Sequence, residues 1–366
     1  MKKNYQLLDI AKFFFSICII GIHTKFLGEY KIGYYIETNI FRIAVPFFFI
    51  CNGYFIAKSM DQNSFDNKKL KKIVKQYFFW CLFYTILYNI FVVWEFSSKK
   101  FVTDIMNIFI LRPTNIMWYL GVLMIFSLVV FFVKDKKKLK IIYLLSILGY
   151  IIGLLFVTYK YLFMGTKYEV MLINFSKCFR SNRYFVFTIM FPFIGYFLYD
   201  NKKIYKLSFC KLLFFLFLNQ IFLFIETFIY YNKSLIFDEY DYFIFTPIVS
   251  LILFIILIRK SFNTKFNTTI LRNYSKLLFF YHFIFIYIFL LYDRIKYSSI
   301  YGADKVIIWF RQNSLRMFLY VLISTMIMAI VINKKRNKNT GGWYYEKEKR
   351  IGNCFWYYKK LWFCLS

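Results

Sequence analysis

Long apolar runs recur along the whole chain and alternate with short polar segments. A membrane-spanning helix needs about 17–25 mostly apolar residues, and the runs are close to that length. No internal repeat of 20–50 residues and no clear inverted halves accompany them. The pattern predicts an all-α fold, a polytopic membrane helical bundle of about ten transmembrane helices at 7–27, 40–57, 77–94, 116–133, 141–159, 184–199, 211–231, 243–258, 277–292 and 315–332.

Lysine and arginine gather in alternate polar segments of this pattern. With the N-terminus in the cytoplasm, four Lys/Arg-containing segments also fall inside, at 58–75, 134–140, 201–206 and 259–276. Cytoplasmic loops of membrane proteins carry an excess of Lys and Arg. An even number of spans then places both termini in the cytoplasm.

Composition agrees with a membrane protein, since 60% of the 366 residues are hydrophobic and 25% are aromatic. The net charge of +31 would suggest nucleic-acid binding in a soluble protein, but these charges lie in short clusters between apolar runs, so no nucleic-acid partner is expected. The seven cysteines show no paired spacing, and neither a disulfide framework nor a metal site is predicted.

The chain divides into a membrane domain over 1–332 and a basic, aromatic tail over 333–366. No small-residue cleavage site follows the first apolar run, so we expect a retained helix rather than a signal peptide. The longest polar stretches span only about two dozen residues, too few for a sizeable soluble domain. Any activity must therefore reside in the membrane bundle.

Asp9, Lys12, Ser16 and His23 form a polar stripe in the first apolar run, in "DIAKFFFSICIIGIHTK". On a helix, Lys12 and His23 differ by only about 20° in azimuth and about 16 Å in height, and Asp9 and Ser16 lie within about 60° of Lys12. A charge within the bilayer costs at least ~2.5–3.5 kcal/mol, so the stripe is expected to face the bundle interior. The alternative is that Lys12 snorkels to the inner headgroups while His23 sits at the outer interface.

Other polar residues near or within the spans have competing structural explanations. Arg42, at the start of the second span, has the position of an interfacial anchor, and Gly53 permits close backbone approach. Trp118 and Tyr119 begin a span where an aromatic belt is common.

Glu226 and His282 lie deeper within their predicted spans. An acid inside an apolar helix has few structural explanations, which makes Glu226 the more informative of the two. For His282 the alternative is a hydrogen-bonded core histidine. No comparable polar residue aligns with His282, so we expect the replacement His282→Ala to have a mild effect.

Several motifs resemble the acyltransferase-3 family of integral membrane acyltransferases. They occur in the order "LLDIAKFFFSICIIGIH", "FRIAVPFFFICNGYF", "IMWYLGVL" and "YHFIFIY". Within that family the chain is most similar to the membrane portion of vancomycin-resistance serine racemases, a likeness that "RSNRYFVFTIMFPFIGYFL" and "LFIETFIYY" strengthen. The resemblance extends to about Ile332. No racemase domain follows in this sequence.

The resemblance implies transfer of an acyl group, usually acetyl, from cytoplasmic acetyl-coenzyme A to a hydroxyl group of an envelope glycan or lipid-linked sugar, in a bacterial inner membrane. The family's basic residue, ten intervening residues and histidine correspond to Lys12 and His23. Its pair of basic residues after the second helix corresponds to Lys69 and Lys72, although Lys68 and Lys71 fit the spacing equally. Phe283 replaces the proline that often follows the late histidine.

The resemblance and the residue types together give a set of roles. His23 is the expected general base, with Glu226 as the next catalytic candidate. Lys12, Lys69 and Lys72 are expected to attract the coenzyme A phosphates. The residues expected to bind the acceptor are Arg42, Trp118, Tyr119, Arg183 and His282, and no metal is required.

Two other functions fit the same residues. A transporter or exporter of a small polar molecule, such as an amino acid, would use Glu226 and the two histidines as a proton relay. A purely structural membrane protein would depend on none of the intramembrane polar residues.

Overall fold

Each of the ten predicted spans overlaps one or two helices in the computed structural model. The structure describes residues 5–28, 30–91, 97–111, 117–171, 174, 185–201, 206–233, 242–259, 268–297 and 313–350. Within these residues six helices are long and apolar enough to cross a membrane, and three shorter apolar helices accompany them. The chain is an all-α polytopic membrane protein. The helices that match the predicted spans are α1 (Gln6–His23), α3 (Ala44–Asp61), α4 (Asn67–Phe91), α6 (Trp118–Phe132), α7 (Lys136–Gly153), α9 (Phe185–Thr188) with α10 (Met190–Asp200), α11 (Phe209–Lys233), α12 (Thr246–Arg259), α13 (Thr269–Tyr297) and α15 (Ser314–Arg350).

The sequence did not predict several shorter elements. Their apolar residues are too few to form a long run, so hydropathy alone does not reveal them. Ser97 caps one of them by accepting a hydrogen bond from the backbone N–H of Lys100 at 3.4 Å. These elements are α2 (Lys31–Asn39), α5 (Ser98–Phe109) and η3 (Lys160–Phe163), whereas the short η1 (Phe41–Ile43) and the π-helical turn η2 (Leu154–Thr158) fall within the predicted spans 40–57 and 141–159.

Two polar segments predicted as loops are partly helical. Helix α4 begins at Asn67, ten residues before its predicted start, and α13 begins at Thr269, eight residues before its predicted start. Lysine and arginine favour helices nearly as well as leucine, and Asp66 caps α4 by accepting from the Lys69 N–H at 2.9 Å. The early start of α13 brings polar residues of the predicted loop into the helix.

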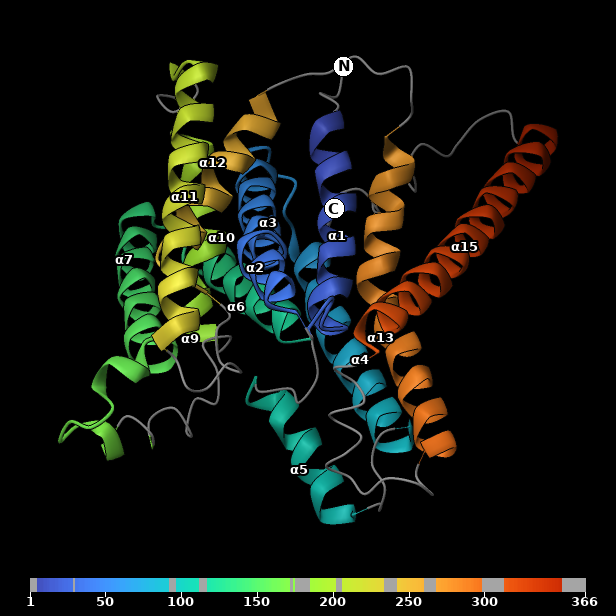
Figure 1. Ribbon diagram of the computed structural model, residues 1–366. Helices are drawn as coiled ribbons and strands as arrows, with labels where there is room; N and C mark the ends of the chain where they lie inside the picture. The colour runs from blue at the N-terminus through green and yellow to red at the C-terminus, as the bar shows by residue number, and fades with distance from the viewer. Residues whose placement is uncertain are drawn as a thin grey trace. The chain divides into compact units, whose positions relative to one another are not determined.

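The chain forms two compact units, a terminal unit of Met1–Gly33 with Lys260–Ser366 and a central unit of Tyr34–Arg259. In the terminal unit, α1, α13 and α15 pack against one another (Figure 1). Helix α15 continues through Asn333, the predicted start of the tail, and ends at Arg350. The division between membrane domain and tail stays a prediction, and residues 351–366 lie outside the described part.

Contacts between α1 and α13 show that the two helices run in the same direction. Asp9 bonds to Arg272, Ser16 to Ser275, and the His23 ring stacks on His282, so partners ascend together along both helices. If both helices cross the membrane, an odd number of crossings must separate them. Among the described residues, the long apolar helices α3, α7 and α11 between them already make an odd number, and counting α4 with the shorter apolar helices α6, α10 and α12 as well gives seven, which is also odd.

Helices α3 and α10 of the central unit approach each other closely. A Cβ atom added at Gly53 would collide with the backbone carbonyl of Pro192, and one added at Gly195 would collide with that of Ile50. Glycine permits such an approach because it has no side chain. The close backbone approach predicted at Gly53 is confirmed.

Candidate functional site

A buried ion pair joins α1 and α13 near their N-terminal ends, which are predicted to lie on the cytoplasmic side. Arg272 donates from Nε to Asp9 Oδ1 at 2.8 Å and from its terminal nitrogen to Asp9 Oδ2 at 2.7 Å. Thr268 donates a third hydrogen bond to Asp9 Oδ2 at 3.2 Å. Planar, two-point contact of this kind is the strong form of an Arg–carboxylate pair. The pair explains how an acid is tolerated in the first helix, and the sequence analysis missed it because Arg272 was placed in a loop.

Above the ion pair, two serines hold the same helices together. The Ser16 and Ser275 hydroxyl oxygens lie 2.6 Å apart, and each is within 3.0 Å of the Lys12 carbonyl oxygen. Lys12 itself is buried. Since Asp9, Lys12 and Ser16 are all buried and two of them bond to α13, the predicted polar stripe faces the interior of the terminal unit. Snorkelling of Lys12 is therefore excluded.

His23 and His282 meet at the opposite end of this seam. Their ring centroids are 5.5 Å apart with planes 27° apart, and Phe283 lies edge-on to both rings, with centroids 4.7 and 4.9 Å away. His23 is half-buried, whereas His282 is fully buried. The expectation that nothing comparable aligns with His282 is wrong. Because α13 begins early, several of its polar residues, His282 included, lie beside the polar residues of α1.

The hydrogen bonding of His282 fixes its protonation pattern when the ring is neutral. Its Nδ1 lies 2.8 Å from the Leu278 carbonyl oxygen, and because a carbonyl only accepts, Nδ1 carries the proton. Nε2 then bears a lone pair, and it is buried without a hydrogen-bond partner among the described residues. Two positively charged imidazoles at this separation would repel each other. The pair is thus suited to hold a single added proton.

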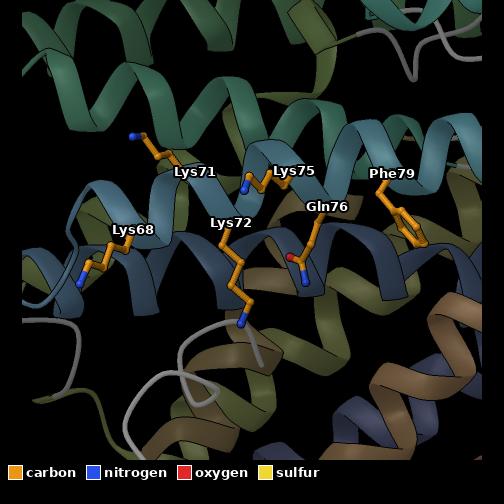
Figure 2. A pocket seen from close by; sticks show the side chains of 6 residues that line it. All are labelled: Lys68, Lys71, Lys72, Lys75, Gln76 and Phe79. Carbon is orange, nitrogen blue, oxygen red and sulfur yellow. The ribbon is translucent and has the colours of Figure 1, made fainter. Parts of the chain in front are cut away.

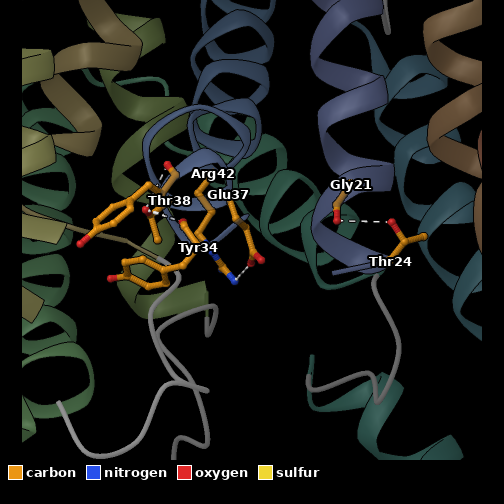
Figure 3. Close-up of polar contacts among 7 residues, drawn as sticks. Gly21, Thr24, Tyr34, Glu37, Thr38 and Arg42 are labelled. Carbon is orange, nitrogen blue, oxygen red and sulfur yellow. Dashed lines mark hydrogen bonds and ion pairs between the residues drawn. The ribbon is translucent and has the colours of Figure 1, made fainter. Parts of the chain in front are cut away.

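The end of α1 is held by Thr24, directly after His23. The Thr24 hydroxyl donates to the Ile20 carbonyl at 2.9 Å and to the Gly21 carbonyl at 3.4 Å, and Figure 3 shows the second of these bonds. The Thr24 backbone N–H also donates to the Ile20 carbonyl at 2.9 Å, which closes the last turn of the helix. Consequently the backbone that carries His23 is ordered by local contacts as well as by α13.

In the central unit, Arg42 is buried rather than placed as an interfacial anchor. Only 8% of its side chain is exposed, and it pairs with Glu37 of α2 at 2.5 Å (Figure 3). Asn39, also on α2, donates to the Thr227 hydroxyl of α11 at 3.0 Å. A buried charge needs a partner, and Glu37 was missed because α2 was not predicted.

The two aromatic candidates at the start of α6 pack inward. Tyr119 is buried, its ring lies 4.3 Å from that of Phe49, and its hydroxyl accepts a hydrogen bond from Asn52 Nδ2 at 2.5 Å. Trp118 is half-buried, with its ring 6.0 Å from Phe49. One face of Tyr119 is therefore occupied by protein, which leaves Trp118 as the more accessible of the two rings.

Glu226 has a structural function that the sequence did not suggest. It accepts hydrogen bonds from the backbone N–H groups of Ile244 at 2.7 Å and Phe245 at 3.3 Å, and from the Tyr159 hydroxyl. Ile244 and Phe245 directly precede α12, whose first N–H groups have no partner within the helix. A carboxylate at this position stabilises the helix N-terminus. These contacts favour a helix-capping role over proton transfer.

The lysines at the start of α4 separate into two groups. Lys69 and Lys72 are half-buried, and the Lys69 ammonium donates to Ser59 Oγ at 3.0 Å. Lys68, Lys71 and Lys75 are exposed. A pocket of ≈ 540 Å³ is lined by Lys68, Lys71, Lys72, Lys75, Gln76 and Phe79 (Figure 2).

Arg183 lies outside the described residues, so its assignment stays a prediction. In the described ranges, no three His, Cys, Asp or Glu side chains gather closely enough to hold a metal ion. Cys18, Cys51 and Cys81 are buried and form no disulfide with any described residue.

Comparison with known proteins agrees with these observations. Residues 5–334 match the acyltransferase domain family, type 3. An amino-acid racemase from Enterococcus faecalis is 26% identical over 356 residues, which cover 92% of this chain and 47% of that protein. The chain thus spans about half the length of this curated relative, and no solved structure matches. The family match over nearly the whole chain, together with the polytopic helical fold, shows that the protein belongs to the acyltransferase-3 family of membrane acyltransferases.

Proposed function

We propose that the protein is an O-acetyltransferase of a bacterial inner membrane, which moves an acetyl group from cytoplasmic acetyl-coenzyme A to a hydroxyl group of an envelope glycan or lipid-linked sugar. The observation that carries this proposal is the half-buried His23 ring stacked on buried His282. A histidine at a partly accessible position can exchange protons with a substrate, and imidazole can act as both acceptor and donor of a proton.

His23 acts as the general base in the proposed reaction. It takes the proton from the acceptor hydroxyl as that oxygen attacks the thioester carbonyl carbon, forming the new ester bond. The carbon–sulfur bond breaks and the coenzyme A thiolate leaves, to be protonated by the histidinium. His282 holds the His23 ring in place and stays neutral while His23 is charged.

Lys69 and Lys72 are proposed to contact the phosphates of coenzyme A. Their half-buried position and their common flank of α4 support this role, since partly buried charges are screened less by salt than exposed ones. Lys12, whose side chain is buried in the terminal unit, adds positive charge near the cytoplasmic end of α1. Long-range attraction by such charges speeds the binding of a polyanion.

The acceptor is proposed to be a neutral hydroxyl compound. Because Glu37 already neutralises Arg42, the pair offers hydrogen-bonding groups without net charge, which suits a sugar better than an anion. Trp118 retains a partly exposed ring for stacking on a sugar.

Mass spectrometry of envelope glycans tests the proposed reaction. Glycans from cells that contain the protein are expected to carry an acetyl group that is missing from cells without it, and a His23→Ala strain should match the latter. Flux of an amino acid across vesicles without any acetylated product would instead establish the transport alternative.

Donor binding can be tested separately. Replacing both lysines, in Lys69→Gln/Lys72→Gln, is expected to raise the KM for acetyl-coenzyme A at least about tenfold, or ~1.4 kcal/mol, because two contacts to phosphate are lost. Lys137→Gln/Lys138→Gln, with exposed lysines at the start of α7, is the matched control. An unchanged KM combined with poor membrane insertion would show that Lys69 and Lys72 only direct topology.

A further inference from the structure

Exposed lysines and exposed apolar residues share one face of α4. Lys68, Lys71 and Lys75 are exposed at its first turns and line the ≈ 540 Å³ pocket together with Phe79. None of the described residues that line this pocket is acidic. Figure 2 shows that the lysine ammonium groups fan out around the helix, with Lys72 directed away from Lys71. The pocket therefore has a concentrated positive charge and an aromatic side.

The same face continues into the apolar part of the helix. At 100° per residue, Phe79, Leu82, Ile86 and Ile90 all fall within about 60° of Lys75. All four are exposed, and Phe79 and Ile90 are more than half exposed, at 60% and 63%.

The opposite face carries the residues by which α4 packs in its unit: Ile73, Tyr77, Cys81 and Tyr84 are buried. The exposed face thus has a charged end and an apolar stripe about 16 Å long from Lys75 to Ile86.

We propose that this face binds an anionic phospholipid. The headgroup phosphate lies among Lys68, Lys71 and Lys75, and an acyl chain lies along Phe79, Leu82 and Ile86. A lipid matches both halves of the face, because its charge and its hydrocarbon chain are arranged in the same order. Coenzyme A offers phosphates but no long hydrocarbon for the apolar stripe.

The proposed lipid-binding face, which carries Lys68, Lys71 and Lys75, is separate from Lys69 and Lys72, which are proposed to bind coenzyme A. Lys69 and Lys72 are turned by about 120° and 60° from Lys75 around the helix and are half-buried, whereas the three lipid-face lysines are exposed. Only Lys72 borders both regions, since it also lines the pocket. The lipid site is independent of the proposed catalytic function, and each can fail without the other.

The test is the affinity of the purified full chain, in phosphatidylcholine nanodiscs, for a fluorescent phosphatidylglycerol. Lys71→Gln/Lys75→Gln is expected to weaken binding about thirtyfold, the effect of ~2 kcal/mol for two lysines near an anionic surface. Lys137→Gln/Lys138→Gln controls for general loss of positive charge and is expected to bind as the unchanged protein does. Circular dichroism confirms that both variants are folded.

Competition identifies the source of the phosphate. Unlabelled phosphatidylglycerol should displace the probe, while soluble glycerol phosphate and coenzyme A should not. Displacement by coenzyme A would assign the pocket to the acyl donor and overturn the proposal. Equal weakening by the α7 control variant, or equal affinity for fluorescent phosphatidylcholine and phosphatidylglycerol, would also overturn it.

Discussion

Acetyl transfer by the His23→Ala variant is expected to be about 10²–10⁴-fold slower than that of the unchanged protein, the usual contribution of general acid–base catalysis. The side chain is half-buried at the last position of α1, so its removal leaves the Asp9 and Ser16 contacts with α13 in place. The variant should therefore fold and accumulate normally. The measurement is acetyl transfer in membranes at matched protein level.

His282 provides the accompanying test, because it acts through His23. His282→Ala is expected to lower transfer about tenfold, or ~1.4 kcal/mol, since the ring that supports His23 is lost. The double variant should be no slower than His23→Ala, because residues that act as one unit are not additive. Near-normal transfer by His23→Ala would remove His23 from the mechanism, and a further loss in the double variant would give His282 an independent role.

Hydropathy was sufficient to locate the ten helices because each span needs a long apolar run, and that requirement is local to the sequence. Gly53 could be interpreted for a similar reason, since only glycine permits backbone contact such as that with Pro192. Ends of helices were less predictable. The polar first turns of α4 and α13 have the composition of loops, although Lys and Arg are good helix formers.

Only those parts of the candidate site that lie on a single helix could be predicted. The shared face of Asp9, Lys12, Ser16 and His23 follows from helix geometry, whereas their partners depend on how α13 packs against α1. Arg272, Ser275 and His282 fall within about 80° on α13, so this face was present in the sequence once the helix was extended to Thr269. The capping contact of Glu226 could not be predicted in this way. The amides that it binds precede another helix, so the residues around Glu226 give no sign of the contact.

The Asp9–Arg272 pair explains the acid near the start of the first helix and has a measurable consequence for stability. Asp9 is almost fully buried, with 3% of its side chain exposed, against 18% for Arg272. A buried ion pair contributes little net stability compared with apolar residues of similar size, but removing one partner leaves an uncompensated charge. A single replacement of Asp9 and a double replacement of Asp9 and Arg272 should therefore differ sharply in their effect on stability.

Asp9→Ala is expected to destabilise the protein by ~3–5 kcal/mol, the usual cost of breaking a buried pair, because Arg272 loses both carboxylate contacts. Asp9→Ala/Arg272→Leu should recover much of that loss, since no unpaired charge is left. Thermal unfolding in detergent, followed by circular dichroism, measures both. Ile10→Ala is the matched control, because Ile10 is the next residue of the same helix and is exposed. If the double variant is less stable than Asp9→Ala, Arg272 stabilises the terminal unit through contacts other than Asp9; if Asp9→Ala is as stable as Ile10→Ala, the ion pair does not hold α1 to α13.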